Sequence, residues 1–519
     1  MMMAELEVKH KDLLGRVGSL QVGGKKVETP AFVPVINPVS QVVPPEEIRR
    51  RFGCGIVITN AYILFKRFRS RAVEEGVHRL IGFDGLVMTD SGGYQVLVYG
   101  DVEATPDDIA FFQESIGSDI AVPLDRPTGL VGRREAEKTV EETLANVRRT
   151  VELVGHGGRC VWVGPVQGGL YRDLVQKCVD EYKRLGFSLY CLGSPTPLMT
   201  AYRYRELVSM ITTTRHVLGT VKPLHLFGAG HPMMFALAVA LGVDMFDSAS
   251  YALFAKEDRY ILPEGTVRLE QLSHLPCSCE VCTRFSAKEL RELEREERFR
   301  NLALHNLFVC FQEVEAIKQA IWEGRMYELL ERKARSHPAV YEAFQHIFTD
   351  EETLRTMALH TPLSKRRGIF LFDTTSLQRP EYRRMAEWLR RWSPSCVDAA
   401  VLVSHRAVVN RRLEKLFELL AKVVGDSCFE VFVHDTPYGL VPLSLYHVFP
   451  ISQTTYPETL VKQLEDKIFR EAAETLAKHG FKKIIIIETR RETYPGYSRK
   501  LAHSLQTSLS KEVVYTTSK

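Results

Sequence analysis

Several strand-like segments of this chain end on residues whose side chains could do chemistry. GLVMTD (85–90) ends on Asp90, DIAVPLD (119–125) on Asp125 and CVWVGPVQ (160–167) on Gln167, while VDMFDSAS (243–250) carries Asp247. A single aspartate in such a place is commonly a helix cap. Paired carboxylates can instead substitute at the anomeric carbon of a sugar, where one attacks and the other moves protons. The set therefore indicates chemistry at a glycosidic bond, with amides to read a planar ligand.

The elements that must position these residues are short apolar strands separated by helical stretches. Eight such strands alternate with helices over about 250 residues, which is typical of a (β/α)8 (TIM) barrel. The other strands are AFVPVI (31–36), GIVITN (55–60), SLYCLGS (188–194) and PLHLFGAG (223–230). Active sites of such barrels lie at the carboxyl ends of the strands, where these side chains would meet.

Two other interpretations of the same region are weaker. A doubly wound sheet would carry a Gly-rich dinucleotide fingerprint, but the GAG at 228–230 is followed by Met233 where the third glycine belongs. Metal-dependent hydrolysis would also use an aspartate cluster, but barrels of that kind need histidines at strand ends. Here His225 lies within a strand and His231 follows the GAG turn.

A cysteine cluster follows the barrel and predicts a metal site. Cys277, Cys279 and Cys282 are closely spaced, whereas the other cysteines are scattered. Three thiolates require a fourth ligand to complete a tetrahedral structural zinc. The helix expected at 287–322 offers His305, and Cys310 is the weaker alternative. A closed shell has no open position, so we expect one structural Zn²⁺ per chain.

After about residue 345 a second α/β pattern begins, with strands expected at 368–373, 399–404, 429–435, 482–489 and 513–517. Between Lys365 and Arg391 there are eight Lys/Arg against three acids. This basic segment (365–391) is either a phosphate-contacting surface or a solvated helix face. The cations proposed for phosphate and the aromatic residues between them are Arg383, Arg384, Arg390, Arg391, Tyr382, Trp388 and Trp392.

Bulk composition excludes little beyond membrane insertion. The chain has 519 residues, of which 45 % are hydrophobic and 25 % charged, with a formal net charge of +4. No run of about 18 apolar residues is present, and the N-terminus lacks the apolar core of a signal peptide. We therefore expect a cytoplasmic protein that does not enter membranes.

Taken together, the motifs resemble those of the tRNA-guanine transglycosylases. They are TPAFVPV (29–35), ITNAYIL (58–64), MTDSGGYQV (88–96), DIAVPLD, PVQGG (165–169), MFDSASY (245–251) and the CSCEVC cluster, whose family pattern selects His305 as fourth ligand. FDSASYALFAKEDRY and HDTPYGLVPLSLYHVFPISQTTYP are similar to the archaeal branch, which makes archaeosine. The resemblance implies exchange of guanine at position 15, in the D-loop of tRNA, for the free base 7-cyano-7-deazaguanine (preQ0).

The resemblance also assigns roles at the matching positions. It implies that Asp247 is the nucleophile that attacks the ribose C1′ and holds the tRNA covalently, and that Asp90 is the general acid/base.

For the base, it implies that Tyr94 stacks on the ring and that Asp125 accepts hydrogen bonds from N1–H and the 2-amino group. Gln167 and the backbone of Gly193 would read the O6 edge.

From the strand count, the cysteine cluster and the new pattern after about residue 345 we expect three parts: a catalytic barrel at 1–275, a zinc-binding helical subdomain at 276–345 and one or more C-terminal α/β domains at 346–519. The expected partners are tRNA, guanine, 7-cyano-7-deazaguanine and a second copy of the chain. Many archaeal members end with an RNA-binding PUA domain. None is evident here, so we expect either that this contact is dispensable or that a separate PUA-type chain supplies it.

Two alternatives remain at this point. One is a queuine-type enzyme that acts on the anticodon, although those enzymes end soon after the zinc unit. The other is a non-catalytic tRNA-binding partner subunit, which should lose a key aspartate, whereas Asp90, Asp125 and Asp247 are all present.

Overall fold

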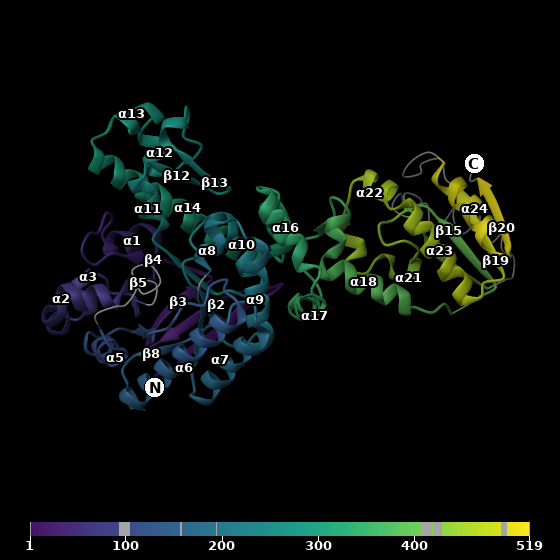
Figure 1. Cartoon of the computed structure of the whole chain (residues 1–519). Helices are drawn as coiled ribbons and strands as arrows, with labels where there is room; N and C mark the ends of the chain where they lie inside the picture. The colour runs from purple at the N-terminus through teal and green to yellow at the C-terminus, as the bar shows by residue number, and fades with distance from the viewer. Residues whose placement is uncertain are drawn as a thin grey trace. The chain divides into compact units, whose positions relative to one another are not determined.

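The computed structural model forms two compact units, residues Met1–Pro362 and Leu363–Lys519 (Figure 1). The residues it describes are 2–92, 104–155, 158–193, 195–395, 397–405, 408, 418, 428–488 and 496–517. None of the described helices is both long enough and apolar enough to cross a membrane.

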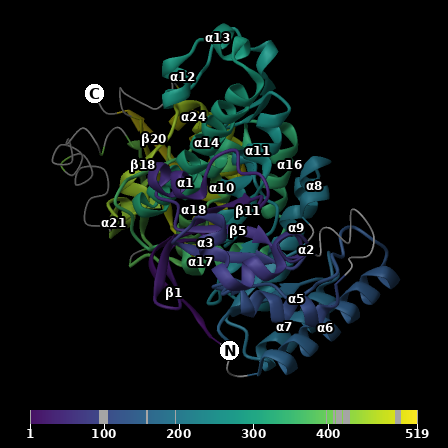
Figure 2. The ribbon, with the colours of Figure 1, turned by 90° about the vertical axis from the view of Figure 1, so that its left-hand side faces the viewer.

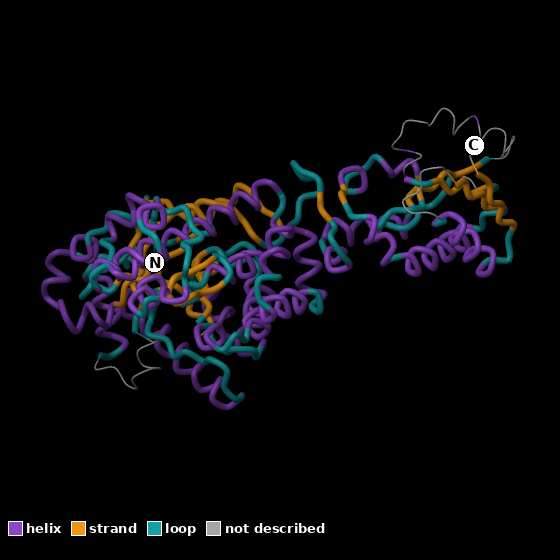
Figure 3. The backbone as a smooth tube through the Cα atoms, turned by 90° about the horizontal axis from the view of Figure 1, so that it is seen from above, coloured by secondary structure: helices purple, strands orange, loops and turns teal. Residues whose placement is uncertain are grey.

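The first unit contains a closed barrel of eight parallel strands, as predicted, in the order β10-β11-β4-β5-β6-β7-β8-β9. Figure 3 shows these strands enclosed by helices. All eight predicted segments supply a barrel strand: β4 (Ala31–Ile36), β5 (Ile56–Asn60), β6 (Leu86–Asp90), β7 (Ile120–Ala121), β8 (Val161–Val166), β9 (Leu189–Leu192), β10 (Leu224–Leu226) and β11 (Met245–Ser248).

Helices connect and cover the strands, as the alternation in sequence predicts. Those of the barrel are α1 (Pro45–Phe52), α2 (Ala61–Glu75), α3 (Val77–Ile81), α5 (Pro106–Ser115), α6 (Arg133–Val154), α7 (Arg172–Arg184), α8 (Thr196–Thr200), α9 (Tyr204–Leu218), α10 (Pro232–Ala240) and α11 (Ser250–Lys256).

Successive strand residues divide between two hydrophobic clusters. Ile56, Ile58 and Met88 belong to the barrel interior, whereas Val57 and Val87 belong to the core that includes the helices. This is the side-chain period of two of a β-strand. The period decides which polar residue at each strand end faces the barrel axis.

An antiparallel sheet that the sequence analysis did not predict precedes the barrel: β1 (Ala4–Asp12), β2 (Gly15–Val22) and β3 (Lys25–Thr29). Leu20, Val22 and Val27 share the interior cluster with the barrel strands. The sheet therefore closes one end of the barrel. In β1, only Ala4 and Asp12 are buried, and most of the residues between them are exposed.

The segments after the barrel form a hairpin and a group of helices, of which α12 and α13 lie beside each other in Figure 2. The elements are β12 (Arg259–Leu262), β13 (Gly265–Arg268), α12 (Glu280–Arg284), α13 (Ala287–Glu292), α14 (Arg295–Glu323), α15 (Met326–Ala334), α16 (Pro338–Ile347) and α17 (Glu351–His360).

The single helix expected at 287–322 is wrong, because the chain extends at Leu293 and Glu294 between α13 and α14. Arg298 stabilises this break: its Nη1 donates to the carbonyls of Arg291 (3.2 Å) and Leu293 (2.9 Å). Its Nε pairs with Asp258 at 2.8 Å.

The second unit is an α/β domain around a five-stranded sheet in the order β17-β16-β15-β19-β20, with β17 alone antiparallel to its neighbour. Four predicted strands lie in this sheet, whereas 368–373 supplies only the short β14 (Ile369–Phe370), which pairs with β18 (Thr454–Thr455). The other strands and α-helices of the described residues are β15 (Ala399–Val403), β16 (Phe429–Val433), β17 (Val441–Pro442), β19 (Lys483–Glu488), β20 (Glu512–Thr517), α18 (Pro380–Arg391), α21 (Leu443–Tyr446), α22 (Glu458–Gln463), α23 (Glu465–His479) and α24 (Tyr497–Ser508).

Candidate functional site

The period of two directs a set of polar side chains toward the barrel axis at the carboxyl ends of the strands. In β5 the interior positions Ile56 and Ile58 are followed by Asn60, and in β6 Leu86 and Met88 are followed by Asp90. Counting in steps of two from the interior residues of β8, β9 and β11 leads in the same way to the polar or small residues Gln167, Gly193 and Asp247. The structure thus brings these predicted site residues to one end of the barrel.

Asp90 ends β6 and contacts the neighbouring strand through an amide. Asn60 Nδ2 donates to Asp90 Oδ2 at 2.9 Å, while Asn60 Oδ1 accepts the N–H of Ile63 at 2.9 Å and caps α2. Burial, together with the charge of Asp247, raises the pKa of Asp90 to about 6, against the opposing hydrogen bonds from Gly92 and Asn60. A carboxyl group with this pKa can both give and take a proton near neutral pH.

Asp125 does not end its strand as predicted, because β7 stops at Ala121 and Asp125 lies in the following loop. It is nonetheless buried, at 7 % exposure. Gln167 Nε2 donates to Asp125 Oδ2 at 2.7 Å, and Gln167 Oε1 accepts the N–H of Thr128 at 2.9 Å. Burial and the charge of Asp90 raise the pKa of Asp125 to about 7.

Gly193 lies directly against Gln167. A Cβ at Gly193 would lie 2.3 Å from Gln167 Nε2, so any larger residue would displace that amide. The N–H of Gly193 donates to the Val166 carbonyl at 3.3 Å. A ligand would therefore compete with this long hydrogen bond for the N–H.

Asp247 lies in the last barrel strand and has two donors on one oxygen. His225 Nε2 lies 2.8 Å from Asp247 Oδ1, and the N–H of Gly228 donates to the same oxygen at 3.1 Å. No role was predicted for His225 from the sequence. The available signal was its place between Leu224 and Leu226, which belong to the outer core and leave His225 facing the barrel axis.

Tyr94, predicted to stack on a base, lies outside the described residues, in the gap between 92 and 104.

The three carboxylates form one electrostatic group. The charge of Asp247 raises the pKa of Asp90, and the charge of Asp90 raises that of Asp125. The hydrogen bonds described for these carboxylates come from amides, an imidazole and the backbone N–H groups of Gly92 and Gly228, rather than from lysine or arginine. Such a group can combine an ionised nucleophile with a carboxyl group that carries a proton.

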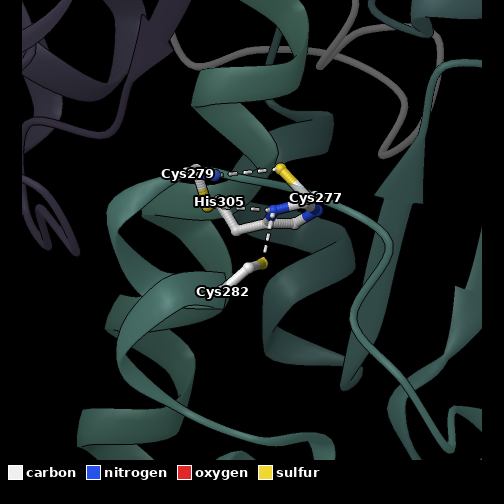
Figure 4. Close-up of side chains that lie close together, drawn as sticks. All are labelled: Cys277, Cys279, Cys282 and His305. Atoms are coloured by element: carbon white, nitrogen blue, oxygen red, sulfur yellow. Dashed lines mark hydrogen bonds between the residues drawn. The ribbon is translucent and has the colours of Figure 1, made fainter.

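A second cluster joins the predicted cysteines to a helix. One ligand atom from each of Cys277, Cys279, Cys282 and His305 lies within 4.8 Å of all the others. His305 Nδ1 is 3.5 Å from Cys279 Sγ and 3.4 Å from Cys282 Sγ, and Figure 4 shows the ring among the three sulfur atoms. The Cys3His donor set suits a tetrahedral ion such as zinc.

The surroundings of His305 orient it as a ligand. Its Nε2 donates to the Ile261 carbonyl in β12 at 2.9 Å, which leaves the Nδ1 lone pair toward the sulfurs. The Tyr260 ring stacks on the imidazole with centroids 3.6 Å apart. The next residue, Asn306, accepts the Ile261 N–H at 2.9 Å and donates to the Arg259 carbonyl at 3.2 Å. Cys310, the weaker ligand candidate, lies outside this set and near the Gly230 carbonyl.

The basic segment (365–391) is less exposed than its composition indicates. Lys365 and Arg379 are buried, and both pair with the buried Glu381. Tyr382 is also buried, and its hydroxyl donates to the Pro437 carbonyl at 2.9 Å. Trp392 packs edge-on against Phe432.

Part of the predicted phosphate surface is therefore a core feature of the second unit. Trp388, Arg390 and Arg391 are the exposed members of α18 among the residues proposed for that surface.

Comparisons with known proteins agree with this arrangement. The model of the queuine tRNA-ribosyltransferase family (TGT) matches residues 12–339. A tRNA-guanine(15) transglycosylase from Methanocaldococcus jannaschii is 41 % identical over 483 residues, which cover 91 % of this chain and 72 % of the relative. One from Methanosarcina mazei is 41 % identical, with 87 % of each chain covered. One from Aeropyrum pernix is 52 % identical over 336 residues, or 64 % of this chain and 65 % of the relative.

Proposed function

The chain belongs to the queuine tRNA-ribosyltransferase family, and from this premise we propose that it exchanges a guanine of tRNA for a free base. The proposed guanine is that at position 15, and the incoming base is 7-cyano-7-deazaguanine, in archaeosine biosynthesis. The names of the relatives support the position. The observation that carries the chemistry is the electrostatically coupled group of Asp90, Asp125 and Asp247 at the barrel mouth.

In the first half of the proposed reaction, Asp247 attacks the ribose C1′ and forms an ester. The C1′–N9 bond breaks, its electron pair leaves with guanine, and protonated Asp90 gives the departing base a proton. The raised pKa of Asp90, about 6, supports this role because a useful fraction of the group carries a proton near neutral pH.

In the second half, the incoming base occupies the place that guanine has left. Ionised Asp90 takes the proton from N9, N9 attacks C1′, and the ester bond returns its electrons to Asp247. Two displacements retain the configuration at C1′, as in retaining glycosidases. The nucleotide must leave its stack to reach a barrel mouth.

Asp125 and Gln167 are the proposed readers of the base, with Gly193 beside them and Tyr94 stacking on the ring. Guanine and its 7-deaza analogue share the edge that a carboxylate and an amide would bind. The contact of Gln167 with Asp125 supports this role, because it holds both groups in one orientation before a base arrives.

For the Cys3His cluster we propose one zinc ion per chain, held by Cys277, Cys279, Cys282 and His305. Four protein ligands leave no open position, so the ion would brace the hairpin and helices after the barrel and take no part in the exchange. Metal analysis should find about one zinc per chain, and Cys277→Ala should lower both zinc content and melting temperature. Normal zinc content in His305→Ala would remove His305 from the shell.

As partners we propose tRNA and a second copy of the chain, with the dimer contact near the zinc-binding helices. If the protein is strictly monomeric at micromolar concentration, the proposed homodimer is wrong.

The deciding experiment follows radiolabelled guanine out of tRNA when 7-cyano-7-deazaguanine is added. Transcripts with guanine 15 replaced, or with the anticodon guanine replaced, distinguish the D-loop from the queuine-type anticodon reaction. Without incoming base, a denaturant-resistant protein–tRNA band should form and should disappear when the base is added. Asp247→Ala should bind tRNA and base but form no band. A band in Asp247→Ala and none in Asp90→Ala would reverse the two roles, and absence of any exchange would favour a non-catalytic subunit.

A further inference from the structure

We propose that His225 is a positioning residue that fixes the carboxylate of Asp247, so that Oδ2 is the oxygen that attacks C1′. This inference rests on the proposed function and adds a residue to it. The two oxygens of this carboxylate have unequal surroundings.

Two donors, one in β10 and one in the turn that follows it, converge on Asp247 Oδ1. One is His225 Nε2 at 2.8 Å, from β10, and the other is the Gly228 N–H at 3.1 Å, from the turn after β10. Gly228 has φ +63°, and a Cβ there would lie 2.2 Å from Thr196 Oγ1, so this turn requires glycine. No described residue donates a hydrogen bond to Oδ2. The lone pairs of Oδ2 are therefore available to attack C1′.

The imidazole is held rigidly. His225 is 0 % exposed, and its ring packs against Phe227 with centroids 4.9 Å apart. Backbone pairing of His225 with Met245 sets β10 in register with the strand that carries Asp247. A donor fixed in this way restrains rotation of the carboxylate about its Cβ–Cγ bond, which the Gly228 N–H alone would not prevent.

The surroundings also decide which ring nitrogen serves as the donor. His225 Nδ1 is buried and has no hydrogen-bond partner among the described residues. Nε2 lies 2.8 Å from Asp247 Oδ1, so the N–H of the ring is used there and His225 orients Asp247 as a hydrogen-bond donor.

The test measures the rate at which wild-type and variant proteins form the tRNA adduct in a single turnover without incoming base. His225→Leu removes the donor and should slow adduct formation on the order of 100-fold while the Kd for tRNA changes less than about threefold. His225→Gln places an amide N–H near the position of Nε2 and should recover at least about tenfold of that loss. His225→Asn places its N–H near the position of Nδ1 and should recover none.

His78→Gln is the matched control, because His78 contacts Asp119 at 2.8 Å at the opposite end of the barrel. It should leave adduct formation unchanged. If His225→Leu does not fold, the comparison of His225→Gln with His225→Asn decides. Equal rates in those two variants, or a wild-type rate in His225→Leu, would overturn the inference. Absence of the adduct in the wild-type protein would contradict the proposed function instead.

Discussion

Aspartates at the two ends of the barrel have different kinds of hydrogen-bond partner. The segment that forms β11 carries one aspartate of each kind. Asp244 precedes β11 and is fully buried, with Arg16 Nε at 2.6 Å and Arg215 Nη2 at 3.1 Å. Asp247, three positions later, faces the other end, where its donors are His225 and the Gly228 N–H.

The strand β7 repeats the contrast. Asp119 precedes it and accepts hydrogen bonds from His78 and Lys25. Burial opposes the shift, but the hydrogen bonds from His78 and Val87 lower the pKa of Asp119. Asp125 follows the strand, has Gln167 as its side-chain donor, and has its pKa raised to about 7. At the amino end, arginine and lysine side chains pair with the carboxylates, whereas amide, imidazole and backbone groups contact them at the carboxyl end.

The largest effect is expected from Asp247→Asn. An amide cannot attack C1′, so exchange should fall by on the order of 10⁴-fold or more, with tRNA binding retained. The labelled-guanine assay measures the loss, and urea unfolding checks that the fold persists. Exchange at a wild-type rate would remove Asp247 from the chemistry.

Asp244→Asn should instead act on stability. It leaves Arg16 and Arg215 buried without their carboxylate, and loss of one partner of a buried pair costs about 3–5 kcal/mol. Urea unfolding measures this cost, and exchange per folded molecule should be unchanged below the transition. If Asp244→Asn were as stable as the wild type, the aspartate at the amino end would not have the stabilising role that the comparison gives it.

Asp90 should make the free energy of unfolding depend on pH. Its folded-state pKa of about 6 lies above the ordinary value, so its contribution is intact below pH 4 and is lost as pH rises through 6. Asp90→Asn should therefore stabilise the fold at pH 7, by at most about 3 kcal/mol, and not at pH 4.

Asp119→Asn is the matched variant at the other end. The lowered pKa of Asp119 contributes stability that is present above its ordinary pKa and lost as pH falls, so this variant should be destabilised at pH 7. Urea unfolding at pH 4 and pH 7 measures both variants. If the free energy of unfolding changed with the same sign in both variants at pH 7, the comparison would be contradicted.

The smallest effect concerns binding of the free base. With a pKa of about 7, Asp125 loses its charge as pH falls, and with it the acceptor for two N–H groups of the base. The affinity for 7-cyano-7-deazaguanine should fall about tenfold per pH unit below 7 and level off above it. Calorimetric titration measures this, and Asp125→Asn should bind weakly at every pH. A flat profile in the wild type would place Asp125 outside the base contact.

Local sequence patterns were sufficient to predict the barrel but not its finer contacts. Each of the eight strands is a short apolar run, and the fold follows from their number and their alternation with helices. Polar residues at strand ends then follow from the period of two, as with Asp90 and Asn60. Asp125 fits less well, because β7 is only two residues long and a loop carries it.

Contacts set by distant segments could not be predicted. The partner of His225 depends on strand register, and the burial of Lys365 and Arg379 depends on Glu381 taking both charges into the core. A composition count treats those cations as surface residues. The roles of Asp90, Tyr94, Asp125, Gln167, Gly193 and Asp247, and the division of the chain at 275 and 345, stay predictions.

The contacts of His305 and Asn306 with β12 have a consequence for association between molecules. A two-stranded hairpin has an outer edge whose free N–H and carbonyl groups can pair with a strand of another chain. Here two adjacent side chains of α14 take the place of a third strand, because they occupy the N–H and carbonyl of Ile261 and the carbonyl of Arg259. The helix that carries His305 thereby also protects the hairpin from edge-to-edge aggregation. Loss of His305 would free the Ile261 carbonyl at that edge as well as weaken the cluster.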